Sequence, residues 1–313
     1  MTMLEPEIGE FESKDIREHV NRLLRDLGWP EPPIKLEEAR AIQKLDLTYY
    51  SKTDLNLLDE IAHKTKLAGA TILGTARKMT EVVEKAGLRG LLLLKENDKK
   101  IFIDDEVVQL KRRFLIAHEI SHDLLPWHRS LLMGDNEHTL NPGCHQMMEA
   151  EANYTARKLI FHGDLFQREA LDCKFSWNSI KALKHRYGNT YTTTLWHMVC
   201  ERDPDHPAFG LIGKHPYHSD IGSRKSNSNV AYFPRSKAFR ERFSHVSSED
   251  LFNVISTYAS RNKKGPIGET ELILTDLNGE SCVFYMYSFS NGYDLLTFGY
   301  FLELHKSLVG FEG

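Results

Sequence analysis

The segment FLIAHEISHDLL, residues 114–125, constrains what this 313-residue chain can fold into more than any other. Apolar residues recur on several faces of the helix expected over 107–125, so this helix is predicted to be buried nearly all round. It also carries His118 and His122, four positions apart, with Glu119 between them. The segment is therefore either a metal site or a core helix that happens to contain histidines.

The spacing of the two histidines suits one zinc ion. Residues i and i+4 lie on one face of a helix, so His118 and His122 can hold a single Zn²⁺. Glu119 is then placed to reach a zinc-bound water rather than the ion and to accept its proton as a general base. In a chain with 15 histidines, a chance HExxH has odds of about one in twenty. A third ligand is therefore needed to distinguish a metal site from a chance motif.

A third ligand is expected from EAEANYTARKLI, residues 149–160, because a catalytic zinc takes three protein ligands and leaves the fourth position to water. Glu149 shares a helix face with small and apolar residues, whereas Glu151 lies on a face typical of solvent exposure. Glu149 is therefore the predicted ligand, and Asn153 is predicted to hydrogen-bond a ligand histidine and fix its tautomer. The alternative is a chance HExxH beside an ordinary surface glutamate.

Two further histidines, His128 and His145, are candidate hydrogen-bond donors to a transition state, although loop histidines are more often solvated. Cys144 beside His145 could indicate a second metal site, but a lone small thiol is the commoner explanation.

Composition narrows the class of protein. The net charge of -4 argues against a sequence-blind nucleic-acid binder. The four cysteines are scattered, with no CxxC pair, which favours a reduced, cytoplasmic setting. No apolar run is long enough to span a bilayer, so a soluble protein with no membrane partner is expected.

The hydrophobic pattern predicts a mostly helical α+β protein. A β-hairpin is expected over 87–105, and a three-stranded meander over 271–301, with type I′ turn chemistry at its two Asn-Gly pairs. Further helices are expected at 13–27 with Ser13 as N-cap, 35–47, 52–69, 144–161 and as a pair within 177–199 joined at Gly188 and Asn189.

The helix pair has the helix, glycine turn and helix order of a DNA-binding helix-turn-helix, with local positive charge. Its second helix begins with threonines and is expected to bury Leu195 and Trp196, which leaves few side chains to read bases. Packing or docking to a protein partner is therefore favoured over direct nucleic-acid binding. The basic residues of the pair are Lys181, Lys184, His185 and Arg186.

Three regions are expected: a zinc metallopeptidase domain over 1–165, a helical region over 166–222 that resembles a helix-turn-helix, and a C-terminal α+β domain over 228–313. A polar linker, GKHPYHSDIGSRKSNSN, precedes the last region.

The sequence resembles the ImmA/IrrE metallopeptidases, a gluzincin-like group. The likeness rests on RRFLIAHEISH after the expected strand KKIFIDD, and on the later run EAEANYTARKLIF, and covers residues 88–162 closely. It implies a small α+β, zincin-like zinc peptidase that cuts or inactivates a helix-turn-helix repressor under stress. His118, His122 and Glu149 match the family's metal ligands, and Glu119 matches its general base.

Two departures concern the substrate cleft: Ser121 replaces the family's common glycine, and LIFHG replaces the usual LLMP. Some members carry a sensory GAF-like domain after the peptidase, with which the region 228–313 is compatible by fold-level analogy.

Together these observations predict a zinc-dependent endopeptidase that hydrolyses a specific regulatory protein, a repressor or an antitoxin-like partner. The alternative is a zinc-containing regulatory protein that binds a partner or DNA without proteolysis.

Overall fold

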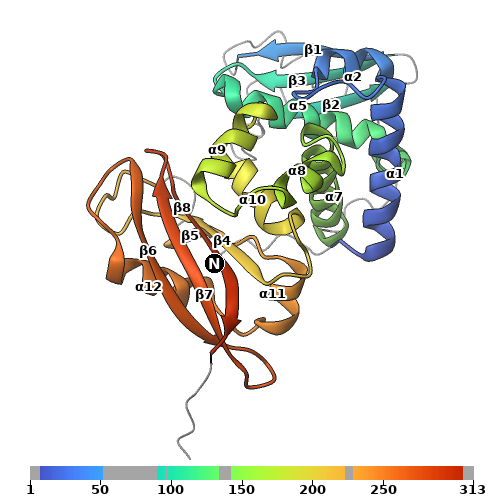
Figure 1. Cartoon of the computed structure of the whole chain (residues 1–313). Helices are drawn as coiled ribbons and strands as arrows, with labels where there is room; N and C mark the ends of the chain where they lie inside the picture. The colour runs from blue at the N-terminus through green and yellow to red at the C-terminus, as the bar shows by residue number, and fades with distance from the viewer. Residues whose placement is uncertain (1–7, 52–89, 96–97, 134–141, 223–227, 306–313) are drawn as a thin grey trace, which may run out of the picture. The chain divides into compact units, whose positions relative to one another are not determined.

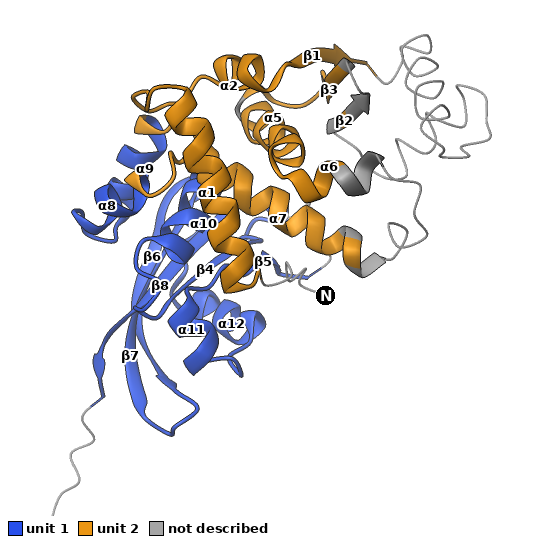
Figure 2. Ribbon diagram, turned by 90° about the vertical axis from the view of Figure 1, so that its right-hand side faces the viewer, with its two compact units in different colours: residues 1–4, 166–185, 190–313 blue, residues 5–165, 186–189 orange. Residues whose placement is uncertain are grey.

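The computed structural model describes residues 8–51, 90–95, 98–133, 142–222 and 228–305. The chain divides into two compact units, coloured separately in Figure 2. The N-terminal unit contains residues 5–165 and 186–189, and the C-terminal unit contains residues 1–4, 166–185 and 190–313. Each unit combines helices with a β-sheet, which confirms the α+β class. The helix expected over 52–69 lies outside the described residues.

The N-terminal unit places a small mixed sheet beside its helices (Figure 1). The strand order is β1-β3-β2, with β2 and β3 antiparallel, as the predicted hairpin requires, and β1 parallel to β3. Its described elements are α1 (Glu10–Asp26), α2 (Leu36–Gln43), β1 (Leu45–Tyr50), β2 (Gly90–Lys95), β3 (Asp98–Asp104), α5 (Gln109–Leu124), α6 (Pro126–Met133) and α7 (Pro142–Ile160).

Two predicted helix boundaries in this unit were wrong. The helix expected over 35–47 ends at Gln43, because Lys44 adopts the left-handed conformation with φ 54° and the next residues form β1. The N-cap of the first helix lies four residues earlier than expected: it is Gly9 rather than Ser13, and the Ser13 hydroxyl donates to the carbonyl of Glu10 inside the first turn.

Helix α5 lies at the centre of the N-terminal unit and packs against α2, α7 and the strands β2 and β3. Its residues Ala117 and Ile120 are fully buried, which confirms the predicted core helix. Lys99 on β3 forms an ion pair with the C-terminal end of α5. Its Nζ lies 2.9 Å and 3.0 Å from the two carboxylate oxygens of the fully buried Asp123. Together these contacts fix the helix that carries the HExxH residues.

The C-terminal unit contains a five-stranded antiparallel sheet of order β5-β4-β8-β7-β6. The expected meander is confirmed as β6, β7 and β8, and β4, which precedes the polar linker, extends it by pairing with β8. The elements after α7 are α8 (Leu165–Leu171), α9 (Trp177–Arg186), α10 (Tyr191–Glu201), β4 (Ala208–Gly213), β5 (Val230–Tyr232), α11 (Lys237–Arg242), α12 (Ser248–Tyr258), β6 (Gly265–Thr275), β7 (Ser281–Ser290) and β8 (Leu295–Leu304).

Helices α11 and α12 pack apolar side chains into the core of the C-terminal unit. Phe239 of α11 and Leu251 of α12 are buried with Phe209 of β4 and Phe284 of β7. The Phe209 ring lies 5.2 Å from that of Phe239 and 6.0 Å from that of Phe284, measured between centroids. Burial of each such side chain contributes about 1.5–3 kcal/mol.

The hairpin turns of the meander are not of type I′, which needs positive φ at both central residues. Gly279 and Gly292 have φ of 85° and 88°, but Asn278 and Asn291 do not adopt positive φ. Instead a side-chain oxygen organises each longer loop: Asp276 Oδ1 accepts the N–H groups of residues 278 and 280, and Asn291 Oδ1 accepts those of residues 293 and 294. The Asn-Gly signal located the turns but gave the wrong type.

The predicted helix pair is confirmed as α9 and α10, with Gly188 at φ 64° between them. Thr190 caps α10, since its hydroxyl accepts the N–H of Thr193. The second helix is largely buried through Thr194, Leu195, His197, Met198 and Val199.

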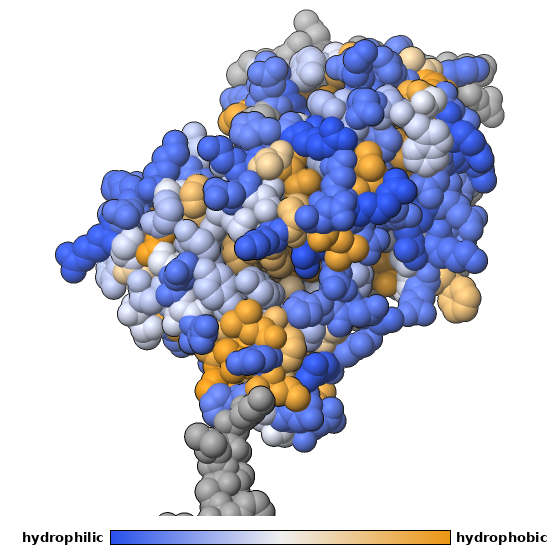
Figure 3. Space-filling view, in the orientation of Figure 1, coloured by the Kyte–Doolittle hydropathy of each residue, from blue (hydrophilic) through white to orange (hydrophobic). Residues whose placement is uncertain are grey.

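Hydrophilic residues dominate the face shown in Figure 3, with an apolar cluster on the C-terminal unit near the end of β8. Exposed apolar side chains on β6 and β8 include Ile273, Leu302 and Leu304. Among the described residues, no helix combines the length and apolar character needed to cross a membrane.

Candidate metal centre

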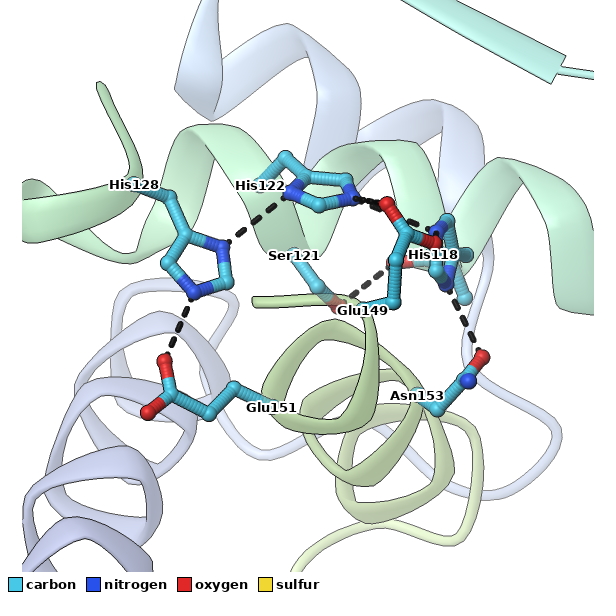
Figure 4. Close-up of polar contacts among 8 residues, drawn as sticks. His118, Ser121, His122, His128, Glu149, Glu151 and Asn153 are labelled. Atoms are coloured by element: carbon cyan, nitrogen blue, oxygen red, sulfur yellow. Dashed lines mark hydrogen bonds and ion pairs between the residues drawn. The ribbon is translucent and has the colours of Figure 1, made fainter. Parts of the chain in front are cut away.

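Two elements that are distant in the sequence build the candidate metal centre. His118 and His122 project from one face of α5, and their ring centroids lie 4.8 Å apart. Glu149 reaches them from α7, which packs against α5 (Figure 4). His118, His122 and Glu149 form a group that could hold a metal ion, with one ligand atom from each residue lying within 4.8 Å of the others.

The separations between these atoms match those around a zinc ion. Ligand bonds of about 2.0–2.2 Å at tetrahedral angles put neighbouring ligand atoms about 3.3–3.5 Å apart. Here the Nε2 atoms of His118 and His122 lie 3.2 Å apart. The Glu149 carboxylate oxygens lie 3.2 Å from His118 Nε2 and 3.6 Å from His122 Nε2. The spacing of the three side chains is therefore compatible with a shared divalent cation.

Asn153, one turn after Glu149 on α7, contacts the outer side of His118. Its Oδ1 lies 3.0 Å from His118 Nδ1. An amide oxygen only accepts, so Nδ1 carries the proton and the Nε2 lone pair of a neutral His118 faces the cluster. The hydrogen bond that the sequence predicted between Asn153 and a histidine of the HExxH segment is thus present.

The burial predicted for the two glutamates of α7 was wrong. The Glu149 side chain is 43% exposed, whereas that of Glu151 is 9% exposed. Thr155 and Lys158, which share the Glu151 face, are also buried. The cause is tertiary: α7 packs against α1 as well as α5, and Trp127 of α6 donates its indole N–H to Glu151 on the face expected to meet solvent. Glu149 nevertheless lies at the histidines, because its helix position points it toward α5.

His128 lies on α6, fully buried, and connects Glu151 to the cluster. Its Nδ1 lies 3.1 Å from His122 Nδ1, and its Nε2 lies 2.7 Å from Glu151 Oε2. Trp127 Nε1 donates to the same Glu151 oxygen at 2.7 Å. Glu151 was considered from the sequence only as a metal ligand and was assigned to a solvent-exposed face, so this buried contact with His128 was missed.

Glu119 projects from α5 beside the cluster and is 6% exposed. Burial raises the pKa of its carboxyl to about 7, with His118 opposing and Glu149 adding to this shift. A cation held by the three side chains would add positive charge nearby and favour the carboxylate form of Glu119. Glu119 therefore has a pKa in the range that suits a general base near neutral pH.

The pKa values of the three ligand candidates shift through their mutual contacts. Burial lowers the pKa of His118, but the hydrogen bond to Glu149 and the charge of Glu119 outweigh it, so the net shift is upward. Burial lowers the pKa of His122, and the contacts with Glu149 only partly offset this. Burial raises the pKa of Glu149, yet the hydrogen bonds from both histidines bring it well below its usual range. Glu149 is thus held as a carboxylate.

Two further residues from the sequence analysis, Ser121 and His145, lie on α5 and α7. Ser121, which stands where the resembled family has glycine, is fully buried and its hydroxyl bonds the carbonyl of Ala117 at 2.7 Å. His145 belongs to α7, but its side chain lies outside the described residues, so its proposed role stays a prediction.

Comparison with known proteins defines the fold. No family model matches the sequence, and no curated protein matches it. Among solved structures, the chain is similar to a Mycobacterium tuberculosis transcriptional regulator, with a TM-score of 0.53 and 13% sequence identity. The likeness covers 93% of this chain and 76% of that chain. At this identity it shows a shared fold and no shared activity.

Proposed function

We propose that this chain is a zinc-dependent endopeptidase that hydrolyses a specific regulatory protein. The observation that carries the proposal is the convergence of the His118 and His122 Nε2 atoms, 3.2 Å apart, with the Glu149 carboxylate, whose two oxygens lie 3.2 Å and 3.6 Å from them, beside the buried carboxyl of Glu119. The choice of a regulator, a helix-turn-helix repressor or antitoxin-like protein, follows from the resemblance to the ImmA/IrrE metallopeptidases.

Three side chains would hold the ion, one would orient a ligand, and one would act as the general base. His118, His122 and Glu149 would bind Zn²⁺, while Asn153 holds the His118 ring in the tautomer that presents Nε2. When bound, a zinc ion polarises a substrate carbonyl and lowers the pKa of water. Glu119 would accept the proton of the attacking water and pass it to the leaving amine.

The open side of the cluster supports a catalytic rather than a purely structural site. Within the described part of the chain, the metal-binding group comprises three residues, and His128 directs its nitrogens to His122 and Glu151 instead. Structural zinc sites close with a fourth protein ligand, whereas catalytic sites keep that position open. The 43% exposed side chain of Glu149 gives the cluster access to solvent.

The deciding experiment compares wild type with Glu119→Gln in cells, with new protein N-termini identified by mass spectrometry. Glu119→Gln should bind zinc as wild type does, yet produce none of the cleavage products. The matched control is Glu303→Gln, an exposed residue of β8, which should cleave normally. Identical products from wild type and Glu119→Gln would remove the peptidase proposal.

A second candidate is a regulatory protein that uses the metal only as a clip and acts by binding a partner or DNA. The observation that favours it is the fold shared with a transcriptional regulator. On this hypothesis, Glu119→Gln keeps the full biological effect, whereas His122→Ala, which removes a ligand, abolishes it. On the peptidase hypothesis, both substitutions abolish it.

A further inference from the structure

A buried chain of polar contacts runs from α7 through α6 to the metal-binding helix α5 (Figure 4). It begins at Glu151, whose oxygen accepts from Trp127 Nε1 and lies 2.7 Å from His128 Nε2. It continues from His128 Nδ1 to His122 Nδ1 over 3.1 Å. All of these side chains except Trp127 are buried.

The hydrogen positions along this chain follow from one requirement. A neutral imidazole has one N–H and one lone pair, so a His122 that offers Nε2 to an ion carries its proton on Nδ1. That N–H needs an acceptor, and His128 Nδ1 is within reach. His128 then carries its own proton on Nε2, which donates to the carboxylate of Glu151. Every donor thereby meets an acceptor.

We propose that Glu151 and His128 are positioning residues that act through His122: together they hold its ring so that Nε2 faces the metal. The inference rests on the metal site of the proposed function. Metal-ligand histidines often donate their second N–H directly to a carboxylate or carbonyl. Here His118 follows that pattern through Asn153, whereas His122 reaches its carboxylate through an intervening histidine.

The arrangement also explains why a carboxylate is buried on α7. An isolated buried carboxylate is costly, and Glu151 offsets that cost through two donors from α6. Loss of these polar contacts would leave the His122 N–H without its acceptor and allow the His122 ring to turn. The expected consequence is weaker metal binding rather than a change in the residues that bind.

The test measures zinc affinity by chelator competition in purified full-length variants. His128→Phe and Glu151→Leu should each weaken zinc binding by about 10- to 100-fold. His128→Gln supplies an amide oxygen that can accept from His122 Nδ1–H, so it should recover most of the loss. His245→Phe and Glu241→Leu, both at exposed positions, are the matched controls and should bind zinc as wild type does.

A second measurement needs no substitution. Nitrogen-15 NMR of the zinc-loaded wild type should show His122 protonated at Nδ1 and His128 protonated at Nε2. The opposite tautomer at His128, wild-type affinity in His128→Phe, or equal losses in His128→Phe and His128→Gln would each overturn the inference.

Failure of this inference differs from failure of the proposed function. If zinc affinity responds as expected but no peptide bond is cut, the peptidase proposal alone falls. If cleavage occurs and the zinc affinity is unchanged in these variants, only the positioning role is refuted. A wild-type chain that binds no zinc would overturn both.

Discussion

His118 Nε2 lies 3.2 Å from a carboxylate oxygen of Glu149, although the two residues belong to different helices. The contact exists because α5 and α7 pack against each other and Asn153 on α7 holds the far side of the His118 ring. One helix thus supplies both a ligand and the residue that orients a ligand on the other helix. This pairing makes the candidate metal site a property of the interface between α5 and α7.

Removing the amide of Asn153 should therefore weaken the metal site. Asn153→Ala deprives His118 Nδ1–H of its acceptor, and zinc affinity should fall about 10-fold. Asn153→Asp keeps an acceptor oxygen and should retain more of the affinity. Gln146→Ala, at an exposed position on the same helix, serves as the control. Chelator competition measures all three, and unchanged affinity in Asn153→Ala would show that the contact is incidental.

Breaking the ion pair between β3 and α5 should lower the stability of the N-terminal unit. Lys99→Met leaves the fully buried carboxylate of Asp123 without its close cation, so the free energy of unfolding should fall by about 1–3 kcal/mol. Adding Asp123→Asn to Lys99→Met should recover part of this loss, because no buried charge then remains. Lys100→Met is the neighbouring control. Urea denaturation measures the series, and equal stability of Lys99→Met and Lys100→Met would contradict the prediction.

Acid should loosen the segment around His215, a buried residue of the C-terminal unit. Burial, together with the charge of His218, lowers the pKa of His215 below its ordinary value of 6.5. As the pH falls, the unfolded chain therefore binds the proton before the folded chain does. The contribution of neutral His215 to folding stability is complete above its ordinary pKa and is lost as the pH falls below it. Protonation of Nδ1 also removes the acceptor for the N–H of Tyr217, which lies 3.1 Å away.

Hydrogen exchange tests this effect at one amide. Protection of the Tyr217 N–H, corrected for intrinsic exchange, should be constant above about pH 7 and should fall as the pH drops below about 6.5. His215→Gln should abolish the pH dependence, whereas His245→Gln should leave it unchanged. Constant protection of Tyr217 across this range in wild type would rule out the proposed linkage.

Gly299 on β8 allows close packing of the sheet core. A Cβ atom at this position would collide with the ring of the fully buried Phe209. Gly299→Ala should therefore destabilise the C-terminal unit by about 1–3 kcal/mol. Phe209→Leu removes the colliding ring atoms, so the double variant should lose less stability than the sum of the two single variants. Strict additivity in thermal or urea unfolding would contradict a direct clash.

Much of the fold followed from local pattern. The spacing of apolar residues located α1, α5, α7 and the helix pair, and the alternating runs located the meander, because each pattern reports which face of an element is buried. The strand β1 and the pairing of β4 with β8 were not foreseen. Both depend on partners far along the chain, which local periodicity does not encode.

The sequence by itself determined the two histidines on one helix face, the acid between them, and Glu149 and Asn153 one turn apart on a second helix. Helix geometry alone sets these relationships. The tertiary structure decided that His118, His122 and Glu149 converge within 4.8 Å, and that Glu151 and His128 lie behind them, buried. Which faces of α7 are covered depends on the packing of α1 and α5 against it, and only long-range contacts specify that packing.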